Sequence, residues 1–159
     1  MTITLYCIGK LKEAYWKDAV NEYRKRILPY SELNIIELPD FPTPQNASLA
    51  EEEAIKEKEC DQVISKLKPS DYLIALDLGH KQANSEQFAL DLQGFLEKGG
   101  SKISFVIGGS LGLSQSIKKR ANAFFTLSEL TFPHQLTRVI LLEQIYRGFR
   151  ILHHQPYHK

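Results

Sequence analysis

The stretch KISFVIGG, residues 102–109, is almost continuously apolar and ends in two glycines. Such a run is typical of a strand covered on both faces, because neither face then presents polar side chains to water. DYLIALDL at 71–78 has the same character. Shorter apolar runs at 3–9, 33–39 and 122–130 complete a set of five predicted strands.

Helical patterns alternate with these runs, at residues 12–27, 48–67, 85–97, 114–121 and 136–152. Ser48 and Glu51 have the spacing of a capping box at the start of the second helix. One apolar stripe of the first helix is predicted to face the core, and it consists of Tyr15, Ala19, Tyr23 and Ile27. The alternation predicts an α/β fold with a mostly parallel sheet flanked by helices, and residues 1–159 are predicted to form one domain.

The composition limits the class of protein. Of the 159 residues, 43% are hydrophobic and 25% are charged, as in an ordinary globular chain. A net charge of +1 argues against a histone-like binder, although a local basic patch is compatible with it. Cys7 and Cys60 have no metal-like spacing and are predicted to be free thiols of a reducing cytoplasm. No signal-peptide pattern and no apolar run of roughly 20 residues is present, so we expect a cytoplasmic protein without a membrane partner.

A glycine-rich segment, FVIGGSLGLS, follows the fourth predicted strand. Gly108 and Gly109 remove Cβ atoms at the carboxyl end of that strand, where ligands bind in open α/β sheets. The segment is neither a Walker A loop nor G-x-G-x-x-G. It fits a tight strand-to-helix turn and a ligand-binding loop equally well.

The fifth strand ends in LSELTFPHQ, which passes through Ser128, Glu129 and Thr131 before Pro133. Proline suits the first turn of a helix, where its missing N–H is not needed. The free N–H groups of that turn could receive a carboxylate or a phosphate.

The last predicted helix carries a charge within its apolar stripe. Arg138 lies in line with Leu142, Ile145 and Phe149, where a charge is costly unless it is paired or reaches an opening. Its stem could pack while its head reaches solvent, or it could be a site arginine aimed at phosphate or carboxylate, and we favour the second interpretation. The helix is so apolar that we expect it to pack on its own sheet and also on a second subunit.

The chain ends in HHQPYHK, which contains three of the five histidines. No helical i,i+4 spacing or cysteine supports a metal site, and none is predicted. Fraying is the usual state of such a tail. Tyr157 with His158 and Lys159 would equally suit stacking on a base and holding phosphate.

Together, FVIGGSLG, LTFPHQLTR, EQIYRGFRI and the closing PYHK resemble the RlmH family, as does the opening IGKLKEAYWKDAVNEYRKR. These proteins are SPOUT-class methyltransferases that modify a pseudouridine of large-subunit ribosomal RNA at N3, using S-adenosylmethionine. The resemblance covers essentially the whole chain. It implies a trefoil-knotted α/β fold that works as a homodimer on ribosomal RNA, within the large subunit or the assembled ribosome. Two segments are less usual for the family: LGHKQANSE at 78–86, and Leu111 in the glycine loop.

The resemblance also assigns roles to residues. It implies a pocket for S-adenosylmethionine that is lined by Leu76, Gly108, Leu127, Ser128, Glu129, Leu130, Thr131 and Phe132. The tail, Tyr157, His158 and Lys159, is implied to cross to the partner subunit and take part in RNA binding or methylation. The candidate catalytic residues are Arg138, Tyr157 and His158. Arg138 and Lys159 are candidates for holding RNA phosphate.

The chemistry leaves some alternatives open. The N3–H of a uracil-like ring must lose its proton, and His158 or His134 could accept it, or a nearby cation could favour the anionic base. Methylation of another RNA such as tRNA is a second possible function. A non-catalytic RNA-binding module, whose glycine loop is only a turn, is a third.

Overall fold

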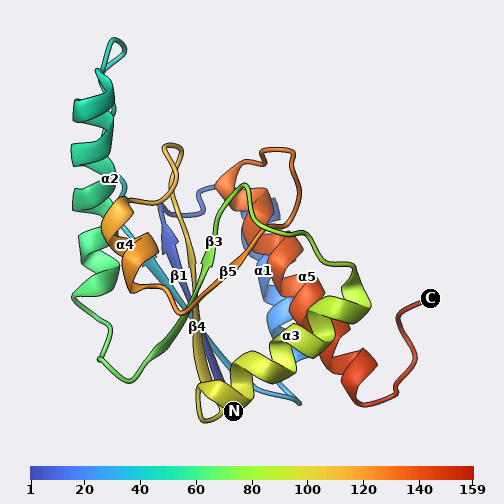
Figure 1. The fold of residues 1–159 in the computed structure, drawn as a ribbon. Helices are drawn as coiled ribbons and strands as arrows, with labels where there is room; N and C mark the ends of the chain where they lie inside the picture. Colours follow the sequence, from blue (N-terminus) through green and yellow to red (C-terminus); the bar gives the residue numbers. More distant parts are fainter.

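Five parallel strands form one sheet at the centre of the protein (Figure 1). The computed structural model describes all of residues 1–159. The strands are β1 (Thr2–Ile8), β2 (Glu32–Leu38), β3 (Tyr72–Leu76), β4 (Lys102–Ile107) and β5 (Ala123–Phe125). Their order across the sheet is β2-β1-β4-β3-β5. The predicted α/β class is therefore confirmed, and the sheet is wholly parallel.

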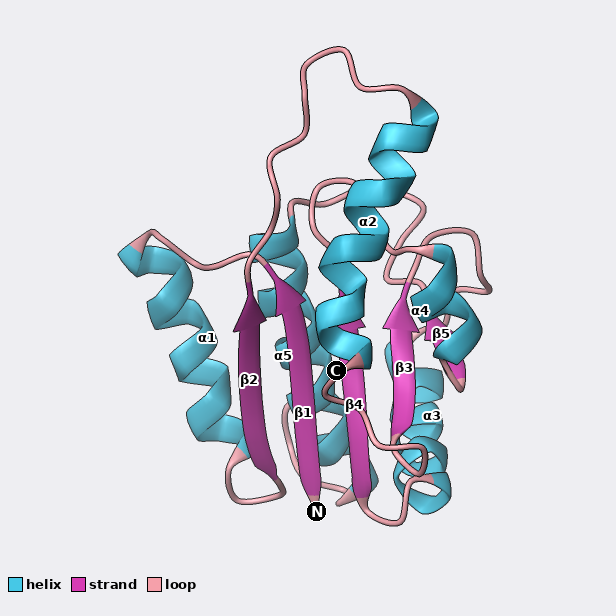
Figure 2. Ribbon diagram, turned by 90° about the vertical axis from the view of Figure 1, so that its left-hand side faces the viewer, coloured by secondary structure: helices cyan, strands magenta, loops and turns pink.

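Helices cover both faces of this sheet, as Figures 1 and 2 show. They are α1 (Ala14–Ile27), α2 (Leu49–Ile64), α3 (Ser85–Lys98), α4 (Gln115–Arg120) and α5 (His134–Leu152). One face carries α1, α3 and α5, and the other carries α2 and α4. The helices are all too short or too polar to cross a bilayer.

Two apolar cores explain why the central strands are so hydrophobic. In β4, Ile103, Phe105 and Ile107 belong to the core under α1, α3 and α5, whereas Val106 belongs to the core under α2 and α4. Successive side chains of a strand point to opposite faces, so a strand covered on both sides must be apolar at nearly every position. Cys7 and Cys60 are buried and free, one in each core.

Helix α5 lies between α1 and α3. Its close approach to α3 depends on Gly148, where an added Cβ would lie 3.2 Å from Leu92 Cδ2. The many apolar side chains of α5 thus have partners on the sheet and on two helices of the same chain. Glu143 and Arg147 form the i,i+4 ion pair on its opposite side.

Two sequence predictions need correction. The fifth strand was expected over 122–130 but spans only Ala123–Phe125, because its partner β3 ends at Leu76 and Leu76 pairs with Phe125. An edge strand has no second neighbour to extend it. In the predicted stripe of α1, Ile27 is buried as expected, but Tyr15 is 64% exposed and lies tilted against Trp16. Val20, which was not part of the stripe, is buried.

Candidate active site

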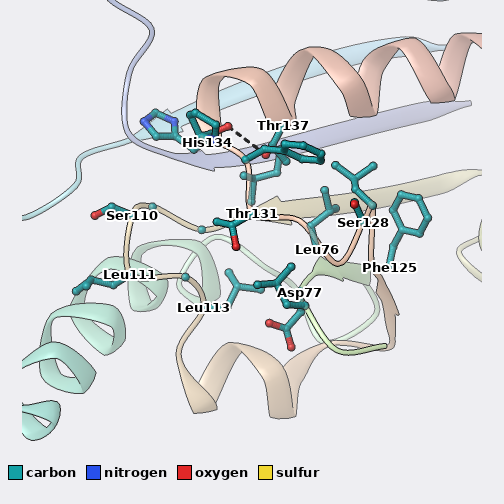
Figure 3. Close-up of a pocket in the computed structure, with 18 of the residues that line it drawn as sticks. Leu76, Asp77, Ser110, Leu111, Leu113, Phe125, Ser128, Thr131, His134 and Thr137 are labelled. Carbon is teal, nitrogen blue, oxygen red and sulfur yellow. Dashed lines mark hydrogen bonds between the residues drawn. The ribbon is translucent and has the colours of Figure 1, made fainter. Parts of the chain in front are cut away.

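A pocket of about 590 Å³ opens at the carboxyl ends of β3, β4 and β5 (Figure 3). Its lining consists of residues 76–78 after β3, 107–113 after β4, 125, 127–128 and 130–134 after β5, together with Lys56, Lys118 and Thr137. Leu76 of β3 pairs with Phe125 of β5 at the strand ends, and both residues line the pocket. The pocket lies where open α/β sheets bind ligands.

The glycine loop forms one wall. A Cβ on Gly108 would lie 2.7 Å from the backbone carbon and oxygen of Gly112, which no real side chain tolerates. The Gly112 N–H donates to Gly109 O at 3.0 Å, and Gly112 has φ +87°, where glycine is favoured. The segment is therefore a tight turn, and it also presents its backbone to the pocket.

The loops after β3 and β5 are tied together at Thr126. Its hydroxyl donates to Asp77 O at 2.6 Å and accepts from the His80 N–H at 3.1 Å. The Asp77 carboxylate lies 3.1 Å from His80 Nε2 and 3.7 Å from Lys118 Nζ. A negative charge at the pocket is thus held between an imidazole and an ammonium group.

Most of the predicted cofactor residues meet at this pocket. Its lining includes Leu76, Gly108, Leu127, Ser128, Leu130, Thr131 and Phe132. Glu129 is exposed and is not part of the lining. Sequence reasoning missed Asp77, Lys118 and Thr137, and it mentioned His134 only as a possible proton acceptor. Asp77 is the one charged residue near the carboxyl end of the predicted strand at 71–78, which was the available signal.

Arg138 does not reach solvent with its head, as the first interpretation had it, and the carboxylate that it meets is that of Glu37 in the same chain. The Arg138 side chain is 0% exposed, so the head does not reach solvent and cannot contact RNA phosphate in this arrangement. Nη1 donates to Glu37 Oε2 at 2.7 Å, and Nη2 donates to Gly9 O at 3.2 Å. The buried charge is thus paired inside the protein, which offsets part of the cost that had suggested a ligand, although Nε has no partner.

Arg138 connects this interior pair to the pocket. Its Nη2 also lies 3.3 Å from Nδ1 of His134, which lines the pocket. Burial and, secondly, the positive charge of Arg138 lower the pKa of His134. Arg138 is not part of the pocket lining itself and touches it through His134.

The tail is folded back on α5 and is not frayed. Tyr157 donates from its hydroxyl to Glu143 Oε1 at 3.0 Å, and its ring packs edge-on against Tyr146. His158 lies 3.1 Å from both Arg147 Nη1 and Glu86 Oε1. Burial, and then the hydrogen bond to Glu143, raise the pKa of Tyr157 to about 12.

The chain's own tail does not line the pocket. The pocket is at the start of α5 and the tail follows its end, and a helix of 19 residues is about 28 Å long. Figure 1 shows the tail turning back after α5, so that the C-terminus lies to the side of α3 and α5. The predicted cofactor residues are therefore brought together, whereas Tyr157, His158 and Lys159 lie apart from them.

The protein has a wholly parallel sheet with a glycine-walled pocket at three strand ends. Residues 1–158 match the family model described as predicted SPOUT methyltransferase, so the chain is an α/β enzyme of the SPOUT methyltransferase class. Within that class, the chain belongs to the family of ribosomal RNA large subunit methyltransferase H, as the resemblance implied. The proteins of that name from Clostridium acetobutylicum and Desulforamulus reducens are 54% and 48% identical to it. The alignments cover 100% of both chains in the first case, and 99% of this chain and 98% of the relative in the second.

Solved structures with little sequence similarity share the fold. A probable methylase family protein from Haemophilus influenzae has a TM-score of 0.56 at 10% identity, covering 99% of this chain and 70% of that one. A probable methyltransferase from Bordetella pertussis has a TM-score of 0.57 at 12% identity, covering 92% and 93%. Identities this low support the architecture alone.

Proposed function

We propose that this methyltransferase transfers a methyl group from S-adenosylmethionine to N3 of a pseudouridine in large-subunit ribosomal RNA. The observation that carries the proposal is the pocket of about 590 Å³ at the ends of β3, β4 and β5. The relatives that match over the full chain are named for methylation of large-subunit ribosomal RNA, which supports the same substrate class. A ribosomal substrate also implies that the protein works in the cytoplasm.

The pocket suits this cofactor in size and chemistry. Its volume lies within the roughly 300–1,000 Å³ of typical cofactor sites. Leu76, Leu127 and Phe132 offer apolar surface for an adenine ring, and Gly108 lets a ligand approach the backbone. S-adenosylmethionine supplies a methyl group already activated by the sulfonium charge.

The protein's own task is then alignment and exclusion of water. Methyl transfer to nitrogen needs the donor carbon and the acceptor nitrogen in line, and a fixed geometry can contribute several powers of ten in rate. The hydrogen bonds of Thr126 to the loop after β3 stiffen the pocket before a ligand enters. Glu129, which is exposed beside the lining, would act at the pocket mouth.

We propose a homodimer in which each tail completes the partner's site. The tail follows the far end of α5, so a second protomer offers the simplest way to bring Tyr157, His158 and Lys159 to a pocket. Tyr157 and His158 would then contact the nucleotide, and Lys159 its phosphate. The trefoil threading implied by the resemblance, and the single domain predicted for residues 1–159 from the chain length, belong to the same proposal.

The test uses two defective protomers. Deleting residues 157–159 should abolish methylation of ribosomes while leaving cofactor binding by calorimetry within about threefold, because the tail does not line its own chain's pocket. A Gly108→Val protomer should lose cofactor binding but keep its tail. Co-expressed mixtures should regain part of the activity, since one hybrid site has a whole pocket and a whole tail. A deletion variant that stays fully active, or mixtures that stay inactive, would contradict the shared site.

The substrate is tested separately. Mass spectrometry of ribosomal RNA from cells that lack the protein should show one lost methyl group, restored by the wild-type chain. Labelled methyl groups that appear only in transfer RNA would show that another RNA is the substrate. Absence of S-adenosylmethionine binding would show a non-catalytic module.

A further inference from the structure

One ring at the pocket has a nitrogen without a partner in the protein. His134 is the first residue of α5 and part of the pocket lining. Its Nδ1 lies 3.3 Å from Arg138 Nη2. Its Nε2 makes no hydrogen bond within the chain and is not among the buried polar atoms left unpaired. This nitrogen is therefore available to a ligand.

The contact with Arg138 decides which nitrogen carries the proton. A guanidinium group has donors and no acceptor, so Nδ1 must accept through its lone pair. The proton of the neutral ring is then on Nε2. The ring consequently offers an N–H group, not a lone pair, at the edge of the pocket.

The orientation of the ring is fixed from behind. Arg138 cannot swing away, because Glu37 Oε2 and Gly9 O also hold its guanidinium at 2.7 and 3.2 Å. The ring itself packs over Gly9, where an added Cβ would lie only 3.0 Å from its Cε1. Figure 3 shows the imidazole at the edge of the pocket, at the end away from Phe125 and Ser128. An N–H group that is held in place before binding loses little entropy when a ligand arrives.

The charges around His134 favour the neutral ring. Burial and Arg138 lower its pKa, while Asp40 and Glu37 oppose this shift more weakly. A second proton would have to be added at Nδ1, directly against the Arg138 guanidinium. His134 is thus unsuited to accept the proton of the target base.

We propose that the Nε2–H of His134 donates a hydrogen bond to a carbonyl oxygen of the target base, next to the nitrogen that is methylated. This inference rests on the proposed function, because it needs a uracil-like ring whose N3 lies between two carbonyl groups. When N3 loses its proton to water, negative charge spreads onto those oxygens. A hydrogen bond to the charged form favours it, so His134 makes the acceptor nitrogen easier to deprotonate. Arg138 is a positioning residue that keeps the correct tautomer of His134 in place.

Two amide substitutions separate the two nitrogens of the ring. His134→Gln puts an amide N–H near the position of Nε2 and keeps the donor toward the pocket. His134→Asn puts an amide oxygen near Nδ1, which keeps the acceptor for Arg138 but removes that donor. Both variants should bind S-adenosylmethionine within about threefold of wild type and unfold at similar temperatures. This makes them matched controls for each other.

The readout is methylation of ribosomes from cells that lack the protein, measured as kcat and KM against pH. His134→Asn should lower kcat roughly a hundredfold, as loss of one donor to a developing oxyanion does. The rise of its rate with pH should move to higher pH, because N3 is then harder to deprotonate. The kcat of His134→Gln should be at least about tenfold higher than that of His134→Asn.

Other results would overturn the inference. Equal loss in both variants together with disappearance of the acidic limb of the pH profile would make His134 the base. A change in KM alone would assign the contact to RNA phosphate, and a change confined to cofactor affinity would assign it to S-adenosylmethionine. No change in either variant would remove His134 from the site. Failure of the wild-type protein to methylate any ribosome would instead refute the proposed function, so the two failures are distinguishable.

Discussion

Removing the charge of Glu37 should destabilise the protein more than removing the charge of its partner Arg138. The side chain of Arg138 is 0% exposed, whereas that of Glu37 is 34% exposed. In Glu37→Gln the amide oxygen can still accept from Arg138 and from the Leu11 N–H, so the main loss is the neutralising charge. An unpaired buried charge costs about 3–5 kcal/mol. Because Arg138 keeps the Gln amide oxygen and Gly9 O as acceptors, we expect Glu37→Gln to lower the free energy of unfolding by about 3 kcal/mol.

Arg138→Met should cost less. Glu37 can then be hydrated where it is exposed, and the loss is limited to the hydrogen bonds to Gly9 O and His134. We expect about 1–2 kcal/mol. The double variant should be more stable than Glu37→Gln alone, since it contains no unpaired buried charge.

Thermal and urea unfolding measure these differences. For a chain of this size, a loss of about 3 kcal/mol lowers Tm by roughly 6–12 °C. Protein concentration must be the same throughout, because the stability of the proposed dimer would depend on it. Arg138→Met should also lose methylation activity while it remains folded, since His134 loses the group that holds it. If Arg138→Met were the less stable single variant, or if the double variant were less stable than Glu37→Gln, the reasoning from burial would be wrong.

Three further outcomes are expected. Gly108→Ala should weaken S-adenosylmethionine binding at least tenfold in calorimetry, because its Cβ would meet the Gly112 backbone at 2.7 Å. The control Gly94→Ala, whose Cβ has nothing within 4 Å, should raise stability by about 0.5–1 kcal/mol. Equal cofactor affinities of Gly108→Ala and the wild type would refute this. Ser48→Ala should cost about 1 kcal/mol in urea unfolding, because the Glu51 N–H loses its acceptor, the Ser48 hydroxyl, at the start of α2. An unchanged midpoint would contradict this. Burial raises the pKa of Cys7 from 9.0 to about 12, so the stability it contributes is fully present below pH 9 and is lost as pH rises toward 12. About 1 kcal/mol should disappear between pH 8 and 10, and Cys7→Ala should flatten this slope; an equal slope in the variant would show that another group is responsible.

Local pattern was sufficient for most of the elements. The runs at 71–78 and 102–109 became central strands because a strand covered on both faces needs apolar side chains throughout. The capping box at Ser48 and Glu51 formed as expected, since both partners lie within one turn of the chain. Gly108 and the loop after β5 were placed in one pocket by the family resemblance, and the structure brings them together because parallel strands end at the same edge of a sheet.

The partners of buried charges were not predictable in this way. Arg138 was recognised as an unusual charge in an apolar stripe, yet Glu37 is 101 residues away in the sequence. No periodicity links positions so far apart, and the same residue types would equally have suited a phosphate ligand. Whether the charge faced inward or outward depended on β2 lying next to β1, which carries Gly9 at its end.

The amino-acid sequence alone thus determined the strands, the helices, their caps and the α/β class, because these depend on spacing within a few residues. Tertiary structure decided where β5 stops, which nitrogen of His134 carries a proton, and that the tail leaves its own pocket. Each of these depends on a neighbour supplied by a distant segment: β3 for β5, Arg138 with its partner Glu37 for His134, and Glu143 on α5 for Tyr157. Contacts of this kind form only when the chain has closed around its cores, so no local pattern encodes them.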